Sequence, residues 1–182
     1  GKTKWNIIKF KIRNYFEIKK REKFLSKNSE KNIKNEKFLY FPLQSEPEAK
    51  SLTTTPFYVN QITLIENIAK SIPINFTLYV KEHPIQKMKF WRSVEDYKKI
   101  SNIPNVKLIH PDIDSQILIS KSQGLISVLG STGFETLFYK KPVILFGEDY
   151  YDEVSMVTKI HSFLELNEKI KYALNNYKFN NK

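Results

Sequence analysis

The chain has 182 residues, which is enough for one α/β domain with a sizeable hydrophobic core and little more. It contains no cysteine, which excludes disulfides and cysteine-ligated metals, and it has no apolar run near the ~20 residues that span a bilayer. Its net charge of +11 lies mostly in residues 1–36, which carry twelve Lys or Arg against four acidic residues, so nucleic-acid binding is not expected of the nearly balanced remainder. With no signal-peptide pattern either, we expect a cytoplasmic protein that is soluble or bound at the inner face of the cell membrane.

Residues 1–36 predict a basic amphipathic helix followed by a linker. Such a helix could lie on an anionic membrane surface, pack against an upstream domain, or cover an edge of the chain's own domain, and the sequence leaves all three open. The polar residues 26–36 lack periodicity and are interpreted as the linker. The helix is indicated by five apolar residues at three- and four-residue spacing among lysines and arginines: Trp5, Ile8, Ile12, Tyr15 and Phe16.

From residue 37 onward, apolar runs alternate with helical patterns, which predicts a parallel sheet built from βαβ units. Strands are expected at Phe38–Leu43, Phe76–Val80, Val106–Ile109, Leu125–Leu129 and Val143–Phe146. Helices are expected over residues 53–71, 93–100, 115–120, 134–141 and 165–177.

The segment Gly124–Gly147 is the clearest βαβ unit of the chain. An apolar run ends at the GSTG sequence of Gly130–Gly133, a helical pattern follows, and Pro142 stops it before the next apolar run. We expect Ser131 or Thr132 to be the helix N-cap, where a hydroxyl, free backbone N–H groups and the helix dipole would bind a phosphate. An ordinary capped helix explains the same residues equally well.

Polar side chains follow three of the predicted strands, at the carboxyl ends where an open parallel sheet binds its ligands. They are Gln44 and Glu46 after the first strand, Lys81 and His83 after the second, and Ser131 and Thr132 after the fourth. A histidine helped by a lysine could neutralise a phosphate oxygen, although a loop histidine bonded to backbone explains it equally well. Glu135, one turn into the following helix, either accepts from ribose hydroxyls or only favours the helix dipole.

The sequence gives no support to a metal site or a catalytic nucleophile. The three histidines, His83, His110 and His161, lack the spacing of metal ligands. The GSTG sequence is not the G-x-S-x-G turn of serine hydrolases. An acidic cluster after the last predicted strand could meet a cation but is interpreted as a solvated loop: Asp149, Asp152 and Glu153. No metal, cofactor or catalytic residue is assigned.

Five segments between Phe38 and Asp152 carry a family resemblance: PLQSEPEAKS, PFYVNQITLIENIAKSIP, LYVKEHP, IPNVKLI and GSTGFETLFYKKPVILFG. In this order they resemble the capsule polysaccharide biosynthesis family, bacterial surface-carbohydrate proteins similar to GT-B glycosyltransferases. The resemblance implies a Rossmann-like parallel sheet flanked by helices, which is one half of a GT-B fold. In that fold the C-terminal half binds the nucleotide-sugar donor and the N-terminal half binds the acceptor.

The resemblance also implies which residues bind substrate. The family's His-Pro motif matches His83-Pro84 and its Ser/Thr motif matches Ser131-Thr132, and both would contact the donor's nucleotide and phosphate. Glu135 matches the glutamate that follows the second motif. The full set of substrate-binding candidates, including the polar loop that would face the active-site cleft, is Gln44, Glu46, Lys81, His83, Pro84, Gly130, Ser131, Thr132, Gly133 and Glu135.

A complete GT-B protein has two such domains, and here the N-terminal one is missing or reduced to residues 1–36. We therefore expect residues 37–182 to be the donor-binding domain of a larger bacterial glycosyltransferase that uses a nucleotide-sugar. Its acceptor would be a glycan or glycolipid bound through the missing domain. Two alternatives stay open: a CDP-glycerol-type glycerophosphotransferase domain of teichoic-acid synthesis, and a truncated, non-catalytic nucleotide- or carbohydrate-binding module.

Overall fold

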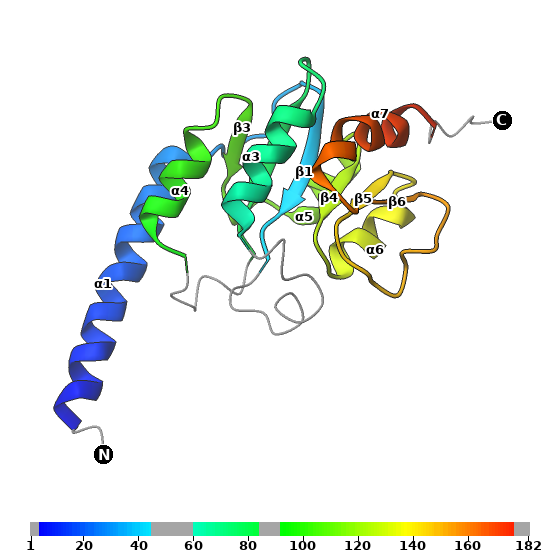
Figure 1. Ribbon diagram of the computed structural model, residues 1–182. Helices are drawn as coiled ribbons and strands as arrows, with labels where there is room; N and C mark the ends of the chain where they lie inside the picture. The colour runs from blue at the N-terminus through cyan, green and yellow to red at the C-terminus, as the bar shows by residue number, and fades with distance from the viewer. Residues whose placement is uncertain (1–3, 45–59, 84–91, 177–182) are drawn as a thin grey trace.

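The structure, a computed structural model, describes residues 4–44, 60–83 and 92–176 (Figure 1). Its centre is a six-stranded parallel sheet in the order β3-β2-β1-β4-β5-β6. The strands are β1 (Phe38–Pro42), β2 (Thr77–Lys81), β3 (Val106–Ile109), β4 (Leu125–Ser127), β5 (Val143–Leu145) and β6 (Val157–Lys159). The helices are α1 (Lys4–Asn28), α3 (Gln61–Ser71), α4 (Val94–Ser101), α5 (Ser115–Lys121), α6 (Ser131–Phe138), α7 (Leu166–Asn176) and a short 3-10 helix (Phe163–Glu165).

The sheet is buried on both faces because its strands are almost wholly apolar. Successive side chains of a strand point to opposite faces, so in β1 Leu39 and Phe41 enter one core while Phe38 and Tyr40 enter the other. The first core is completed by α3, α4 and α7, which lie in front of the sheet in Figure 1. The second core is completed by α5 and by Tyr151 from the loop after β5.

The predicted α/β class and parallel sheet are confirmed, and all five predicted strands are present with bounds that differ by at most two residues. The sequence does not predict β6, a short edge strand whose middle residue is Thr158. Helix α3 begins at Gln61 behind the N-cap Asn60, whose side chain accepts from Thr63 N at 3.2 Å. The earlier helix start predicted at residues 53–56 lies outside the described residues.

Helix α1 is joined to the domain by its C-terminal end. Leu25 is buried in the first core, Arg21 is buried beside α4, and the ring of Phe24 stacks on that of Tyr97 with centroids 6.5 Å apart. The helix runs to Asn28, so the first residues of the predicted linker are helical. The division into residues 1–36 and 37–182 stays a prediction.

The residues after α1 bind the sheet through backbone and side chains. Glu30 bridges to β3, donating from its N–H to Leu108 O at 2.8 Å and accepting from His110 N at 2.9 Å. The carboxylate of Glu36 accepts from the hydroxyl of Tyr79 at 2.5 Å and pairs with Lys107. The polar residues between α1 and β1 therefore extend the edge of the sheet.

Candidate functional site

The order of the strands reverses between β1 and β4, so the crevice beyond their carboxyl ends is where a sheet of this topology binds ligands. Gln44 follows β1 and reaches across this point. Its side-chain amide donates to Leu129 O at 2.6 Å and lies 3.4 Å from Ser127 Oγ. The structure therefore brings together the loops after the first and fourth predicted strands, as the sequence led us to expect.

Gly130 forms the turn from β4 into α6. Its φ of 106° lies in the region that favours glycine, and it occupies the N-cap position of α6 with no side-chain cap. The prediction that Ser131 or Thr132 is the N-cap is therefore wrong: both lie inside the first turn of the helix. The reason is steric, because the chain leaves β4 through a conformation that only glycine adopts freely, and the helix begins directly after it.

The peptide groups of Gly130 are held by the loop that follows β5. Asp149 Oδ2 accepts from Gly130 N at 2.8 Å, and the hydroxyl of Tyr151 donates to Gly130 O at 3.0 Å. We call this pair, Asp149 and Tyr151, the Gly130 clamp. Asp149 is buried, which corrects the interpretation of this part of the acidic cluster as a solvated loop. Among the described residues, no group of His, Cys, Asp or Glu could hold a metal ion.

Gly133 is glycine because Tyr151 packs against it. A Cβ at this position would lie 2.1 Å from the Tyr151 hydroxyl oxygen and 2.7 Å from its Cζ, closer than atoms can approach. Tyr151 is buried, and burial raises the pKa of its hydroxyl, which keeps it a neutral donor to Gly130. Both glycines of the GSTG sequence therefore serve the geometry of the turn.

The two residues between these glycines, Ser131 and Thr132, have hydroxyl groups that are available to a ligand. Ser131 is exposed and Thr132 half-buried, and neither hydroxyl forms a hydrogen bond with any part of the chain that the structure describes. The first backbone N–H groups of a helix have no partner within the helix itself. The start of α6 thus combines unpartnered hydroxyls with helical N–H groups, an arrangement that binds anions.

Lys81 lies at the carboxyl end of β2 and is buried. Its ammonium donates to Ser115 Oγ at 2.8 Å, at the first residue of α5, and the hydroxyl of Tyr40 approaches the same oxygen at 3.4 Å. Burial raises the pKa of Tyr40 to about 12, and the nearby negative charge of Glu135 adds to the rise. Lys81 is therefore a buried positive charge beneath the crevice. The negative charge of Glu135, which is exposed on α6, acts on the neighbouring Tyr40.

Next to Lys81, Glu82 is the centre of a buried charge network. Its Oε2 accepts from Arg92 Nε at 2.8 Å and from the Tyr97 hydroxyl at 2.6 Å, while its Oε1 accepts from the backbone N–H of His83 at 2.8 Å. Arg92 also donates to Gln44 O at 3.0 Å. This Glu82–Arg92 network ties the end of β2, with the exposed His83, to the end of β1.

Gln61, the first residue of α3, fixes Gln44 from the other side. Its side chain accepts from Gln44 N at 2.7 Å and donates to Gln44 O at 3.3 Å. The sequence did not single out Gln61, Glu82 or Arg92. Glu82 had the strongest signal, since a carboxylate inside LYVKEHP follows a buried strand and must find a partner.

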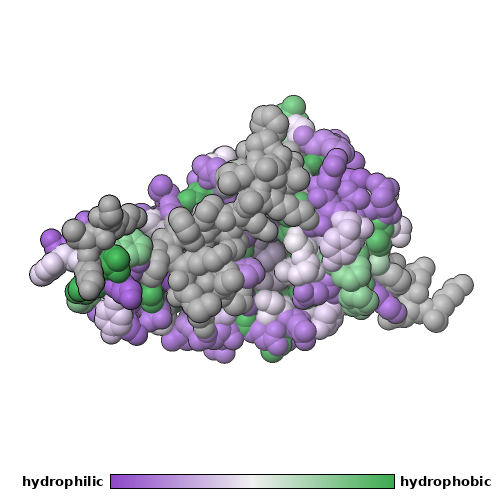
Figure 2. Space-filling view, turned by 90° about the horizontal axis from the view of Figure 1, so that it is seen from below, coloured by the Kyte–Doolittle hydropathy of each residue, from purple (hydrophilic) through white to green (hydrophobic). Residues whose placement is uncertain are grey.

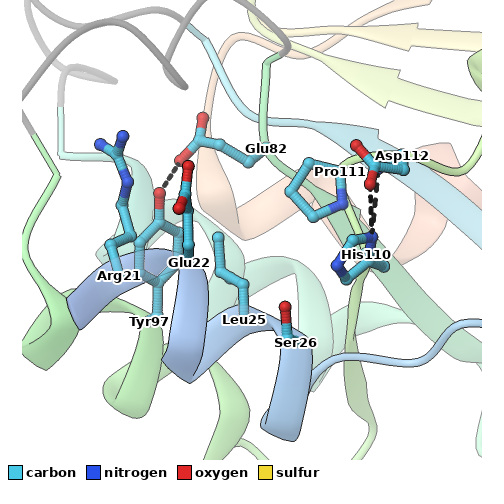
Figure 3. A pocket seen from close by; sticks show the side chains of 9 residues that line it. All are labelled: Arg21, Glu22, Leu25, Ser26, Glu82, Tyr97, His110, Pro111 and Asp112. Atoms are coloured by element: carbon cyan, nitrogen blue, oxygen red, sulfur yellow. Dashed lines mark hydrogen bonds and ion pairs between the residues drawn. The ribbon is translucent and has the colours of Figure 1, made fainter. Parts of the chain in front are cut away.

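A cavity of about 230 Å³ lies between α1 and the ends of β2 and β3 (Figure 3). Arg21, Glu22, Leu25 and Ser26 of α1 form one wall. Glu82, Tyr97 and the segment after β3 form the other, where His110 Nδ1 lies 3.6 Å from Asp112 Oδ2. The buried network therefore borders solvent through this cavity.

The structure thus describes eight of the ten candidate residues. Lys81 ends β2, and Gln44, His83 and the GSTG sequence follow three adjacent strands of the sheet. Glu135 lies in the helix that the GSTG sequence begins. Glu46 and Pro84 lie outside the described residues. Four further residues hold the backbone of these candidates in place through the hydrogen bonds described above: Asp149, Tyr151, Glu82 and Arg92.

The sequence model of the family described as "Capsule polysaccharide biosynthesis protein" matches residues 2–172. No curated protein matches the chain. Solved structures share its fold, among them "Thermosulfurimonas dismutans KpsC, beta Kdo 2,7 transferase", which is 21% identical with a TM-score of 0.55 over 86% of this chain and 51% of that one. The beta Kdo 2,4 transferase of the same organism's KpsC is 15% identical, with a TM-score of 0.55 over 84% of this chain and 53% of that one.

A UDP-GlcNAc 2-epimerase from Methanocaldococcus jannaschii is also similar, with 17% identity and a TM-score of 0.54 over 86% of this chain and 43% of that one. The chain therefore spans about half the length of these proteins. At these identities, the likeness concerns the fold. No helix in the described part of the chain is long and apolar enough to cross a membrane.

Proposed function

Because the chain belongs to the capsule polysaccharide biosynthesis protein family, we propose that it is the donor-binding half of a glycosyltransferase for bacterial surface polysaccharide. The donor is a nucleotide-sugar, bound in the crevice beyond β1 and β4. The acceptor, a glycan or glycolipid, binds through a second domain. The similar structures include two Kdo transferases and a UDP-GlcNAc 2-epimerase, which supports a fold that handles nucleotide-linked sugars.

One observation carries the proposal: the start of α6 presents unpartnered hydroxyls at the switch point of the sheet. Ser131 and Thr132 have no hydrogen-bond partner in the described chain, whereas the polar side chains around them are engaged. A phosphate placed here accepts from the N–H groups and hydroxyls of the first helical turn and meets the positive end of the helix dipole.

The surrounding residues have complementary roles in this proposal. Buried Lys81 supplies positive charge, and His83, exposed at the end of β2, supplies a nitrogen that donates to a phosphate oxygen. Gln44 holds the two loops at a fixed separation. Glu135 accepts from sugar or ribose hydroxyls.

The chemistry proposed is transfer of the sugar from its phosphate to an acceptor hydroxyl. The acceptor oxygen forms a bond to the anomeric carbon as the bond from that carbon to the phosphate oxygen breaks. The acceptor hydroxyl releases its proton to a base, and the departing nucleotide carries the negative charge. The α6 N-terminus and His83 stabilise that charge as it develops, which lowers the barrier to the chemical step. No metal or cofactor is assigned a role.

The test is calorimetric titration of the chain with CMP, CDP, UDP and GDP, beside thermal unfolding with each. A nucleotide that binds only the folded state raises the melting temperature, and the selective one identifies the base. CDP-glycerol is added as a further ligand, because its selective binding would favour glycerophosphate transfer instead.

Removal of both hydroxyls, Ser131→Ala with Thr132→Ala, is expected to weaken nucleotide binding about tenfold while leaving the melting temperature nearly unchanged. The matched control removes two exposed hydroxyls elsewhere, Thr63→Ala with Ser120→Ala. Equal affinity of the two double variants for the selected nucleotide would overturn the phosphate site.

A further inference from the structure

Helix α1 has two halves with different surroundings. Its C-terminal half is fixed to α4 and the first core through Arg21, Phe24 and Leu25. Its N-terminal half extends past the domain, at the side where β1 ends (Figure 1). The projecting half therefore lies on the same side of the molecule as the candidate site.

The projecting half exposes an apolar stripe. The side chains of this stripe are 51–68% exposed: Trp5, Ile8, Ile12, Tyr15 and Phe16. Two further apolar side chains of this half, Ile7 and Phe10, are 46% and 55% exposed on the other side of the helix. At about 100° per residue, the five residues of the stripe fall within an arc of roughly 100°. The middle of that arc is about half a turn from Arg21, which faces the domain, so the stripe points away from the protein.

Basic side chains border this stripe on both sides. By the same helical geometry, Lys11 lies beside one margin, and Lys9 and Lys20 lie beside the other. Further along, Lys19 and Lys23 continue the outward face itself. Helix α1 contains nine basic residues and two acidic ones.

Of the two glutamates of α1, one lies away from the outward face and the other offsets the charge of Lys19 alone. Glu17 lies on the side of the helix that faces the domain, where it lines a second cavity, distinct from that of Figure 3, together with Arg13 and Arg21. Glu22 is paired with Lys19 at 3.1 Å. In Figure 2, which views the molecule from below, apolar and hydrophilic atoms lie side by side over the α1 end at the left.

We propose that the outward face of α1 docks on the surface of an anionic lipid bilayer. An apolar stripe bordered by lysines matches the boundary between acyl chains and negatively charged headgroups, where the lysine stems follow the apolar layer and their ammonium groups reach the phosphates. Tryptophan and tyrosine favour the same boundary. A protein partner would have to supply a carboxylate for each of these lysines, whereas an anionic bilayer presents negative charge along the whole face.

Docking in this orientation puts α1 between the bilayer and the domain, on the side of the molecule where the helix projects past the strand ends (Figure 1). The proposal is separate from nucleotide binding, because the five residues of the stripe are exposed to solvent on the side of α1 that faces away from the domain.

The test is co-sedimentation of the full chain with vesicles of phosphatidylcholine alone and of phosphatidylcholine with phosphatidylglycerol. We expect binding to the anionic vesicles, at least tenfold weaker binding to the neutral ones, and weakening by salt. Ile8→Asp with Ile12→Asp is expected to abolish binding, and Lys9→Glu with Lys11→Glu to weaken it about tenfold or more. All four positions are exposed, so the helix and the domain remain folded, as circular dichroism would check.

The matched control, Lys169→Glu with Lys171→Glu, makes the same change of charge on α7, at the far end of the sheet from α1 (Figure 1). It is expected to keep nearly full binding. The proposal is overturned if the chain does not bind anionic vesicles, or if the control variant loses as much affinity as the α1 variants. Nucleotide affinity, measured in parallel, is expected to be the same in all of these variants.

Discussion

The two sides of the switch point use their polar side chains in opposite ways. On the β1–β2 side, Glu82 and Arg92 are buried and form hydrogen bonds with each other, with Tyr97 and with the loop backbone. On the β4–β5 side, the hydroxyls of Ser131 and Thr132 have no partner in the described chain. The first side fixes the shape of the crevice, and the second leaves groups available to a ligand.

The difference separates positioning residues from binding residues. A buried charge without its partner is costly, so substitutions in the network should act mainly on stability. An exposed hydroxyl contributes little to folding, so its loss should act mainly on binding. The comparison between the two sides can be tested by measuring both quantities for variants of each.

The largest effect is expected from Arg92→Leu. It leaves the carboxylate of Glu82 buried without its cation, which should lower the free energy of unfolding by about 3–5 kcal/mol in urea denaturation. The control is Glu95→Gln, which removes an exposed ion pair with Lys98 and should cost about 0.5 kcal/mol or less. The double variant Glu82→Leu with Arg92→Leu should recover part of the loss. A double variant that loses as much as the sum of its two single variants, or more, would contradict a coupled pair.

Gly133→Ala should have the next largest effect. Its methyl group would overlap the Tyr151 ring, so the ring must move, at a cost of about 1–3 kcal/mol in the free energy of unfolding. Ser131→Ala, in the same turn but exposed, should change stability by about 0.5 kcal/mol or less. Similar losses for the two variants would mean that Tyr151 does not hold this turn.

Tyr151→Phe tests the Gly130 clamp more finely. It removes the hydrogen bond to Gly130 O and keeps the ring, so unfolding should become easier by about 1 kcal/mol. The control is Tyr150→Phe, whose side chain is 70% exposed. If both substitutions lowered the melting temperature equally, the hydroxyl of Tyr151 would not stabilise this turn.

The smallest effect concerns Glu36, a partly exposed carboxylate that contrasts with buried Glu82. Burial alone would raise the pKa of Glu36, but hydrogen bonds from Lys107 and Tyr79 outweigh it and lower the pKa. Its contribution to stability is therefore present above its unfolded-state pKa of about 4.3 and is lost as the pH falls through the lower folded value. Glu36→Gln should lose less stability than the parent chain between about pH 5 and about pH 3 in urea denaturation, and parallel curves would contradict the assignment.

Much of the fold follows from the sequence because local pattern determines it. Runs such as residues 76–80 and 143–146 are apolar and β-branched enough to be recognised without their neighbours. Strand β6 could not be predicted in this way, because it contains one apolar, one polar and one charged residue and it forms only by pairing with β5 of the sheet. The N-cap of α6 at Gly130 was not predicted, because it depends on the positive φ of this residue, and the neighbouring Ser and Thr do not indicate that backbone conformation.

The sequence predicted where the candidate residues lie in the sheet, but not which residues hold them there. Polar residues at strand ends meet at one edge in any parallel sheet, which is why Gln44 and the GSTG sequence could be placed together. The partners that hold them are distant in sequence: Asp149 reaches Gly130 across 19 residues, and Arg92 reaches Gln44 across 48. No local pattern reports such contacts.

The central claim is that the open start of α6 binds the phosphate of a nucleotide. The most direct measurement is the backbone amide NMR spectrum of the isotope-labelled chain, titrated with the nucleotide selected by calorimetry and with its nucleoside, which lacks the phosphate. Large shifts of the Ser131 and Thr132 amides with the nucleotide, and small ones with the nucleoside, are the predicted result. If the nucleotide binds while these two amides stay unmoved, the phosphate lies elsewhere and the claim is wrong.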